Sequence, residues 1–450
     1  MDGDLTPLLA LDALTLRARL ASGALDAVAL TRACLAQIAE HDGALRAFAR
    51  HDPAHALAQA EALDRRRRAG LPIGPLHGLP VAVKDVIDTA GMETANGTAL
   101  DAGRMPARDA FVVARLKAAG AVILGKTVTA ELAFRHPGET RNPAAPGRTP
   151  GGSSSGSAAA VAAGMVPLAL GTQTAGSVLR PASYCGVTGF KPSFGAIPRT
   201  GVLAQAPSLD TMGVFARSTA EAALIAEALF GHDPEDPATA PAPGPRLLEG
   251  ALSQPPLAPV FACIGAPLIA GADPEMRAAI SELATALGDQ AFDVDLPDEF
   301  SAGIAARERI NLAEMAKCYH RYEQRGGAIL SLQMREALAA GAAMPARDYL
   351  AALDWPQVLN AGLEKLFERC DALLLPAAPG PAPEGLNSTG SASFNAIWTL
   401  CGLPAISLPL LETPEGLPLG VQLVGRRGED ARLLRSARWL ETFVLSGETA

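Results

Sequence analysis

The sequence predicts an α/β protein, in which strands and helices alternate along the chain. Short apolar runs rich in β-branched residues predict buried strands, and the segments between them have the apolar spacing of helices. The clearest alternation is a strand at 81–83, a helix at 109–119 and a strand at 121–126. A similar unit ends the chain, with strands near 404–409 and 419–425. Such alternation is typical of a sheet covered by helices.

The composition is that of a well-packed globular protein. Of the 450 residues, 49% are hydrophobic and 19% are charged. Length alone indicates two or three domains, because single hydrophobic cores usually stop growing at about 250–300 residues. The Pro-rich stretch 232–259 could be mistaken for a domain boundary. We expect it to be a surface connector instead.

The first seventy or so residues have a helical pattern. Apolar side chains from Val28 to Ile38 recur on one predicted face. Pro53 opens a second, alanine-rich helix that reaches the arginines at 65–68, just before Gly70. Positive charges at a helix end complement its dipole, so a solvated face explains this basic run. We expect these helices to serve packing.

Beyond the helices, one residue of the first predicted strand is unusual. Lys84 follows the apolar run 81–83, and burying an ammonium group is costly unless it is paired or neutral.

The stretch 203–217 is predicted to be rich in loops. The later pattern predicts a helix at 219–230, a strand at 259–265, a helix at 273–288, mainly helices over 303–370, a strand running into a rigid loop over 371–383, and a closing helix at 429–441.

Charge and apolar runs argue against two classes of partner. A net charge of −9 and a pI near 5.4 disfavour nucleic acid, which requires a basic face. No membrane span is expected, because the longest apolar run, 158–170, is short and contains Gly164 and Pro167. Acidic residues interrupt the N-terminal region, so we expect no signal peptide.

The cysteines and histidines indicate neither a disulfide framework nor a metal site. The six cysteines are spread along the chain without a C-x-x-C pair, and the seven histidines are scattered. We therefore expect buried free thiols in a reducing compartment, no metal, and a cytoplasmic protein.

The stretch 149–195 concentrates glycine, serine and alanine around several hydroxyl groups. Its first part, GGSSSGS at 151–157, predicts a flexible loop that brings serines to a helix N-terminus. A phosphate-binding loop would need a Gly-Lys-Ser/Thr ending, which is missing. We expect Ser154 and Ser155 to cap the helix that follows and to orient Ser153.

The second part of this stretch predicts a strand that breaks into a glycine-containing turn with Ser177 exposed on it. The Gly-x-Ser-x-Gly pattern of the α/β-hydrolases is absent, and no histidine lies nearby. A serine nucleophile at 177 would therefore need another base, and Lys84 is the candidate.

These motifs together resemble the amidase signature family. The matching residues are G-G-S-S-S-G-S-A-A-A, the G-T-Q-T-A-G-S-V-L-R-P-A-S turn, the spacing of 24 from Ser153 to Ser177, V-A-V-K-D at 81–85, GKTVTAELAF at 125–134, CGLPAISLP and GLPLGVQLVG. The resemblance covers nearly the whole chain. It implies a single α/β/α domain over 1–450, with a large mixed sheet covered by helices on both faces. Within it we expect packing helices at 1–75, a catalytic core at 76–220 and a C-terminal part at 260–450.

The resemblance also implies a Ser-cisSer-Lys triad and no metal or organic cofactor. Ser177 is then the nucleophile that forms an acyl-enzyme, Ser153 bridges after a cis Gly152–Ser153 peptide bond, and Lys84 is the base. The oxyanion hole would consist of the backbone N–H groups of Thr174, Ala175, Gly176 and Ser177. We expect Thr172 to contribute a supporting hydrogen bond.

The proposed base requires a perturbed lysine. A free lysine has a pKa near 10.4 and is protonated at neutral pH, so it could not accept a proton. Burial of Lys84 behind Val81 and Val83 would lower its pKa.

Two departures from the common family pattern bear on the substrate. Gln173 stands where many members have aspartate, and the arginine after the nucleophile is shifted one position, to Arg180. This variant is similar to malonamidase-type members, which implies that Arg180 binds a substrate carboxylate. The alternative is that Arg180 pairs with an internal acid.

We therefore expect hydrolysis of a small carboxamide, such as the monoamide of a dicarboxylic acid, without nucleic acid or membrane as partner. A homodimer is left open. A second hypothesis is the glutaminase subunit of a tRNA-dependent amidotransferase, which would pass ammonia to a partner. A third, non-enzymatic hypothesis is a catalytically silent binding protein with the same fold.

Overall fold

One mixed sheet of 11 strands runs through the protein. The computed structural model describes residues 6–447. The strands are β1 (Phe48–His51), β2 (Pro80–Lys84), β3 (Val122–Thr127), β4 (Leu168–Gln173), β5 (Thr188–Lys191), β6 (Thr211–Ala216), β7 (Phe261–Ile264), β8 (Ala291–Val294), β9 (Ala372–Pro376), β10 (Ala405–Glu412) and β11 (Pro418–Val424). Their order across the sheet is β1-β3-β2-β4-β6-β5-β10-β11-β9-β7-β8.

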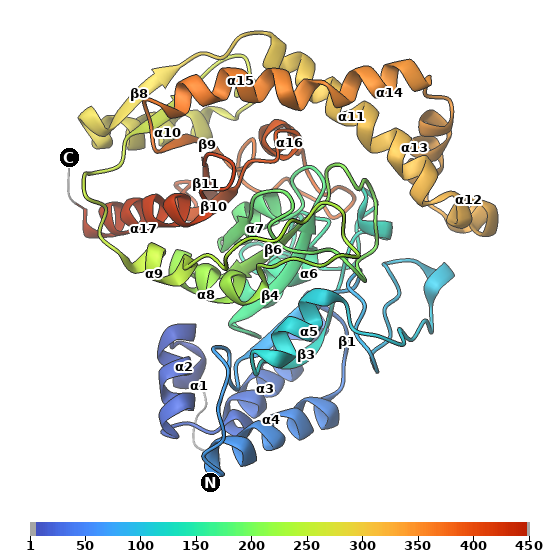
Figure 1. Ribbon diagram of the computed structural model, residues 1–450, viewed down its shortest axis with the longest axis vertical. Coiled ribbons are helices and arrows are strands. Elements are labelled where there is room, and N and C mark those ends of the chain that lie inside the picture. Colours follow the sequence, from blue (N-terminus) through green and yellow to red (C-terminus); the bar gives the residue numbers. More distant parts are fainter. Residues whose placement is uncertain (1–5, 448–450) are drawn as a thin grey trace.

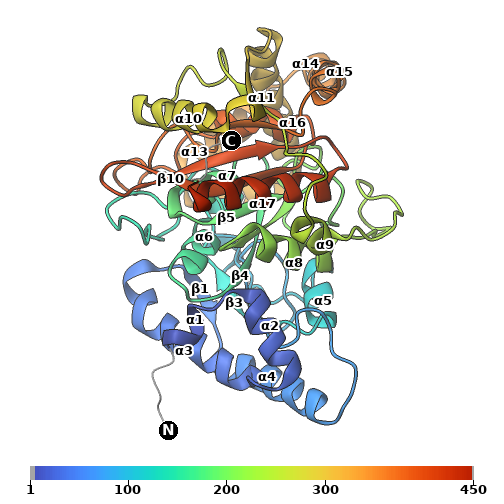
Figure 2. The ribbon, with the colours of Figure 1, turned by 90° about the vertical axis from the view of Figure 1, so that its left-hand side faces the viewer.

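Helices cover the sheet on both faces and extend beyond its two ends (Figures 1 and 2). The helices are α1 (Thr6–Leu9), α2 (Ala13–Ser22), α3 (Ala27–Leu45), α4 (Pro53–Arg68), α5 (Phe111–Ala118), α6 (Ser155–Ala162), α7 (Leu179–Cys185), α8 (Thr219–Leu229), α9 (Leu247–Leu252), α10 (Pro274–Leu287), α11 (Glu299–Cys318), α12 (His320–Gly326), α13 (Leu332–Ala342), α14 (Ala346–Leu353), α15 (Trp355–Phe367), α16 (Ser393–Leu400) and α17 (Asp430–Ser446). Helices α1 to α4 lie at one end and α10 to α15 toward the other. The predicted α/β/α domain with a large mixed sheet is confirmed.

Strand register brings the lysine at the end of β2 beside the end of β4. β2 pairs in parallel with both β3 and β4, and Val83 lies opposite Leu170. The ends of β2 and β4 are therefore adjacent, which places Lys84 beside Thr172. β6 pairs antiparallel with β4 and brings Thr211 opposite Gln173. The three strands form the floor of the candidate site.

The structure differs from the sequence prediction at several short elements. The stretch 203–217 was predicted to be rich in loops, but it contains β6, a fully buried strand near the middle of the sheet. Gly213 in β6 leaves no space for a side chain, because an added Cβ would lie 2.6 Å from Val178. This glycine interrupts the apolar run that signals a buried strand.

Three other strands and three helices were also absent from the prediction: β1, β5, β8, α7, α9 and α16. Helix α9 lies inside the predicted connector 232–259 and buries Leu247 and Ala251. Each of these elements has eight residues or fewer, too few for a clear period. The boundaries expected near 75, 220 and 260 remain predictions.

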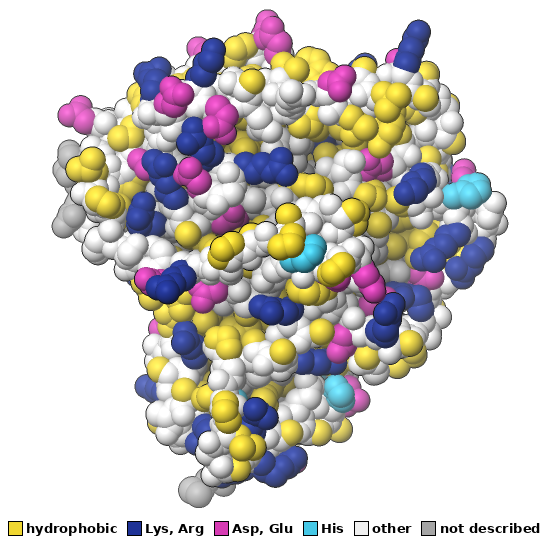
Figure 3. Space-filling view, viewed as in Figure 1, with side chains coloured by type: hydrophobic (Ala, Val, Ile, Leu, Met, Phe, Trp, Pro, Cys, Tyr) yellow, Lys and Arg dark blue, Asp and Glu magenta, His cyan; other side chains and the backbone are white. Residues whose placement is uncertain are grey.

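Residues 6–447 contain no helix that is long and apolar enough to cross a bilayer. In the same part of the chain, no three His, Cys, Asp or Glu side chains are grouped as metal ligands would be. On the face shown in Figure 3, acidic and basic side chains are interspersed.

Candidate active site

Lys84 lies at the centre of the candidate site and is completely buried, with 0% of its surface exposed. Its Nζ lies 2.7 Å from Ser153 Oγ and 2.8 Å from Thr172 Oγ1, and no ion pair joins it to a carboxylate within residues 6–447. Burial lowers the pKa of Lys84 to about 7, although the charge of Asp210 acts in the opposite direction. With this pKa, Lys84 can be neutral near physiological pH. The peptide bond Gly152–Ser153 is cis, as the resemblance implied.

The serines that follow Ser153 do not cap helix α6 as expected. Ser154 occupies the N-cap position but its side chain makes no capping hydrogen bond. Its Oγ instead accepts from the Thr172 N–H at 3.3 Å and donates to the Thr172 carbonyl at 3.2 Å. Ser155 Oγ donates to the Val128 carbonyl at 3.4 Å. The prediction of capping was wrong because Thr172 of β4 and Val128, the residue after β3, lie close enough to bind these hydroxyl groups.

Ser177 lies on the turn between β4 and α7. Its Oγ makes no hydrogen bond to another described residue, and its side chain lines a large cavity. The backbone N–H groups of residues 174–177 likewise donate to no acceptor within the described part of the chain. Unpaired amide donors beside a free hydroxyl are the arrangement that an oxyanion hole needs. The structure thus brings the predicted donors together with the predicted nucleophile.

Two side chains hold this turn. Gln173 Oε1 accepts from the N–H groups of Val178 and Leu179 at 2.9 and 3.1 Å. Its Nε2 donates to Thr399 Oγ1 at 3.0 Å, and that hydroxyl donates to the Ala175 carbonyl at 2.8 Å. Gln173 was noted in the sequence only as a departure from a common aspartate, and Thr399 was missed. No sequence signal links Thr399 to a turn more than two hundred residues away.

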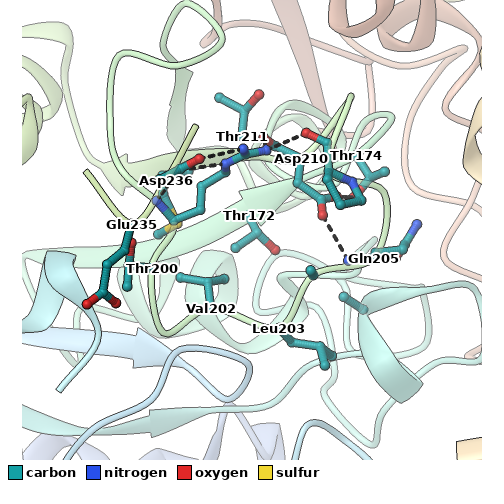
Figure 4. A pocket seen from close by; sticks show the side chains of 15 residues that line it. Thr172, Thr174, Thr200, Val202, Leu203, Gln205, Asp210, Thr211, Glu235 and Asp236 are labelled. Atoms are coloured by element: carbon teal, nitrogen blue, oxygen red, sulfur yellow. Dashed lines mark hydrogen bonds and ion pairs between the residues drawn. The ribbon is translucent and has the colours of Figure 1, made fainter. Parts of the chain in front are cut away.

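Asp210 holds Thr174, the first residue of the turn, through a hydrogen bond. Its carboxylate accepts from Thr174 Oγ1 at 2.6 Å and from the N–H groups of Gln205 and Ala206 at 2.8 and 2.9 Å. Burial raises the pKa of Asp210 to about 6. Figure 4 shows Asp210, Thr174, Thr172 and Gln205 around a small cavity of about 150 Å³. Asp210 was missed in the sequence because it lay in a predicted loop.

Gly176 gives a direct test of the turn geometry. A Cβ at this position would lie 2.4 Å from Asn395 Oδ1 and 3.1 Å from Ala392 Cβ. Gly176→Ala should therefore push the turn away from α16 and misplace the backbone donors. We expect kcat to fall by about 10²–10³-fold, as for the loss of one oxyanion donor. Steady-state kinetics with a chromogenic amide measures it.

The matched control is Gly147→Ala, since a Cβ at Gly147 meets nothing within 4 Å. That variant should keep the wild-type kcat. If Gly176→Ala also kept it, residues 174–177 would not act as oxyanion donors.

The cavity above Ser177 has a volume of about 830 Å³ and is lined by the turn, α11 and the loop 387–393. Arg180 lies in its wall and is only 5% exposed. Its Nη2 donates to the Gly152 carbonyl at 2.5 Å and to Thr389 Oγ1 at 3.3 Å, while its Nε is buried without a partner. No ion pair joins Arg180 to a carboxylate among residues 6–447. The alternative that it pairs with an internal acid thus finds no acid partner.

The fold and the site define a class of protein: a hydrolase in which a serine, a lysine with a lowered pKa and free backbone donors meet below a cavity. The chain belongs to the amidase family, since the family model described as Amidase matches residues 29–434. It is an amide hydrolase, as expected from the sequence.

Known proteins are similar over almost the full chain. A glutamyl-tRNA(Gln) amidotransferase subunit of Chloroflexus aurantiacus is 36% identical, with 93% of each chain covered. The peptide amidase of Stenotrophomonas maltophilia superposes with a TM-score of 0.84 at 31% identity, covering 98% of both chains.

A second structural neighbour superposes with a TM-score of 0.90 at 31% identity, covering 98% of this chain and 99% of the other. It comes from a structure described as an unexpected vestigial protein complex that reveals the evolutionary origins of an s-triazine catabolic enzyme.

Proposed function

We propose that this amidase hydrolyses a small carboxamide that bears a carboxylate, through an acyl-enzyme on Ser177. The observation that supports this proposal is that Arg180, buried and without an acid partner in residues 6–447, lines the same cavity as Ser177. A guanidinium group binds a carboxylate through paired hydrogen bonds, and a buried one without an anion is costly.

In the acylation step, the Ser177 hydroxyl attacks the amide carbonyl while Ser153 takes its proton. Ser153 passes its own proton to the neutral Nζ of Lys84, 2.7 Å away. Thr172 accepts a hydrogen bond from the same Nζ. This bond orients the neutral amine so that its lone pair points at Ser153. The oxygen of the tetrahedral intermediate is stabilised by the free N–H groups at 174–177. The intermediate collapses when Lys84 returns the proton, through Ser153, to the leaving nitrogen, which departs as neutral ammonia or amine.

In the deacylation step, water replaces the departed nitrogen and attacks the ester carbonyl of the acyl-enzyme. Ser153 and Lys84 now take the proton of the water, by the same route as before. The proton returns to Ser177 as the C–O bond breaks, which releases the carboxylic acid product. Each half-reaction thus uses Lys84 first as base and then as acid, so a pKa near neutrality suits both.

Arg180 is the residue whose replacement tests the carboxylate. Arg180→Ala should raise KM for succinamate by about 10–100-fold, because a charge-assisted hydrogen bond is worth about 1.5–3 kcal/mol. The KM for butyramide, which has the same chain length without the charge, should change by less than about threefold. Ammonia release measures both.

Arg180→Lys is the companion variant, because it keeps the charge but loses the planar fork. It should restore part of the affinity for succinamate. Equal losses on succinamate and butyramide would show that Arg180 only supports the Gly152 carbonyl.

The second candidate is a glutaminase subunit that hands ammonia to a partner. The curated relatives support it more directly than the first candidate, because the relative from Chloroflexus aurantiacus is 36% identical over 93% of both chains and is named as an amidotransferase subunit. The cavity favours the first candidate: glutamine has an α-ammonium group, and within the described chain Glu308 is the one carboxylate in the lining. Glu308 is already paired with Arg135 and Arg307.

Ammonia release from succinamate, butyramide and glutamine at equal concentration separates the candidates. We expect succinamate to have the highest kcat/KM. A preference for glutamine, together with a stable complex with a synthetase-like subunit on co-purification, would establish the second candidate. The homodimer remains a prediction, which the mass of the purified protein in solution tests.

A further inference from the structure

Arg307 faces the same cavity as Ser177 and Arg180 but comes from a different part of the fold. It belongs to α11, in the outer helical layer, whereas Arg180 belongs to α7 near the sheet (Figure 1). Arg307 is 7% exposed, so both arginines are almost fully buried. Two buried guanidinium groups therefore border the space above the nucleophile.

The guanidinium group of Arg307 is not satisfied by its protein partners. Its Nη2 donates to Glu308, but Glu308 also pairs with Arg135 at 2.6 Å. One carboxylate is thus shared by two cations. Nε of Arg307 is buried without a partner, and Nη1 donates to no acceptor among residues 6–447. Buried donors without acceptors are costly, and a ligand that supplies acceptors would remove that cost.

The charges in the cavity wall point to the same kind of ligand. Within the described chain, its charged residues are Arg135, Arg180, Arg307 and Glu308, which leaves two positive charges uncompensated. Burial lowers the pKa of Arg180 to about 10, and the nearby charges of Arg135 and Arg307 act in the same direction. Burial also lowers the pKa of Arg307; the charge of Glu308 opposes this shift and that of Arg135 adds to it. Like charges held together in a buried space favour an anion between them.

We propose that Arg307 binds a second carboxylate of the substrate, so that the preferred substrate is a carboxamide with two carboxylates, one at Arg180 and the other at Arg307. The inference rests on the proposed function, which places the first carboxylate at Arg180. Nη1 and Nε of Arg307 are the donors without a partner among residues 6–447, and Glu308 holds the guanidinium group in place through Nη2. No covalent step is added to the reaction: Arg307 determines which amides are held over Ser177.

The test compares three amides that differ in charge: butyramide with none, succinamate with one carboxylate and 2-carboxysuccinamate with two. In the wild-type enzyme, we expect kcat/KM for 2-carboxysuccinamate to exceed that for succinamate by at least about tenfold. Arg307→Gln should remove this difference and change kcat/KM for succinamate by less than about threefold. Arg307→Lys, which keeps the charge, should retain part of the preference.

The matched control is Arg309→Gln, because Arg309 is exposed on the same helix. It should leave all three values unchanged. The inference is wrong if 2-carboxysuccinamate is no better than succinamate, or if Arg307→Gln lowers both to the same extent, as it would if the two arginines held a single carboxylate. A failure of the proposed function looks different: succinamate would then be no better than butyramide.

Discussion

Ser177→Ala is expected to lower kcat/KM on every amide substrate by at least about 10⁴-fold, the scale seen when a serine nucleophile is removed from such a site. The variant should fold normally, because Ser177 Oγ makes no hydrogen bond to another described residue. A fluorophosphonate probe, which labels activated serines, should label the wild-type protein at position 177 and fail to label the variant. Kinetics and mass spectrometry of the labelled peptide measure the two effects.

Ser155→Ala is the matched control for this prediction. Ser155 belongs to the same serine-rich stretch and is buried, but its hydroxyl is bound to the Val128 carbonyl rather than facing the cavity. This variant should keep nearly all activity. If the wild-type protein folded normally but was not labelled, the hypothesis of a catalytically silent binding protein would be supported instead. If Ser177→Ala kept full turnover, Ser177 would not be the nucleophile.

The sequence could name the candidate site residues that carry a local signal. The alternation of strands and helices predicted the α/β class, and the run of glycines and serines identified Ser153 and Ser177 as candidates. Lys84 was conspicuous because it follows a buried strand, where an ammonium group is costly unless it is paired or neutral. Each of these signals is local, so it can be seen without knowledge of tertiary packing.

What could not be predicted depends on contacts between distant segments. Thr399 reaches the turn 174–177 only because α16 packs against it, and Asp210 is adjacent only because β6 pairs with β4. Arg307 lies on a helix whose pattern indicates packing alone, and its role in the cavity follows from the position of α11 over the turn. Residues 154 and 155 were misassigned for the same reason, since their partners come from other strands.

Gln173 holds the turn through both ends of its side-chain amide. Its amide both accepts from the turn, at Val178 and Leu179, and donates to Thr399. A carboxylate at this position could accept in the same way but could not donate to Thr399. The amide of Gln173 therefore holds the turn through both its oxygen and its nitrogen.

Lys84→Met is expected to abolish turnover, with kcat lowered by at least about 10³-fold, because Lys84 is the one side chain hydrogen-bonded to Ser153 Oγ within residues 6–447. In the wild-type enzyme, kcat/KM should rise with pH through an acid limb centred near the Lys84 pKa of about 7. Below that pH the amine is protonated and cannot accept a proton, so kcat/KM should fall by about tenfold per pH unit. A pH profile of ammonia release measures this limb.

Asp210→Asn determines whether the limb belongs to Lys84. Asp210 is the charge that raises the Lys84 pKa, so its removal should move the limb to lower pH, whatever it does to the rate. Lys126→Met is the control, because Lys126 is a second buried lysine, on β3, and its loss should leave the limb in place.

The pH dependence of the free energy of unfolding gives an independent measure of the Lys84 pKa. The pKa of Lys84 is about 7 in the folded protein against 10.5 for a free side chain, so between these values the unfolded chain binds more protons. The penalty for burying the amine is therefore largest below pH 7 and disappears as the pH rises toward 10.5. The stability of the wild-type protein relative to Lys84→Met should rise across this window. A pH-independent difference in the free energy of unfolding would mean that Lys84 is not a neutral amine in the folded enzyme, and the proton route through Ser153 would then need another base.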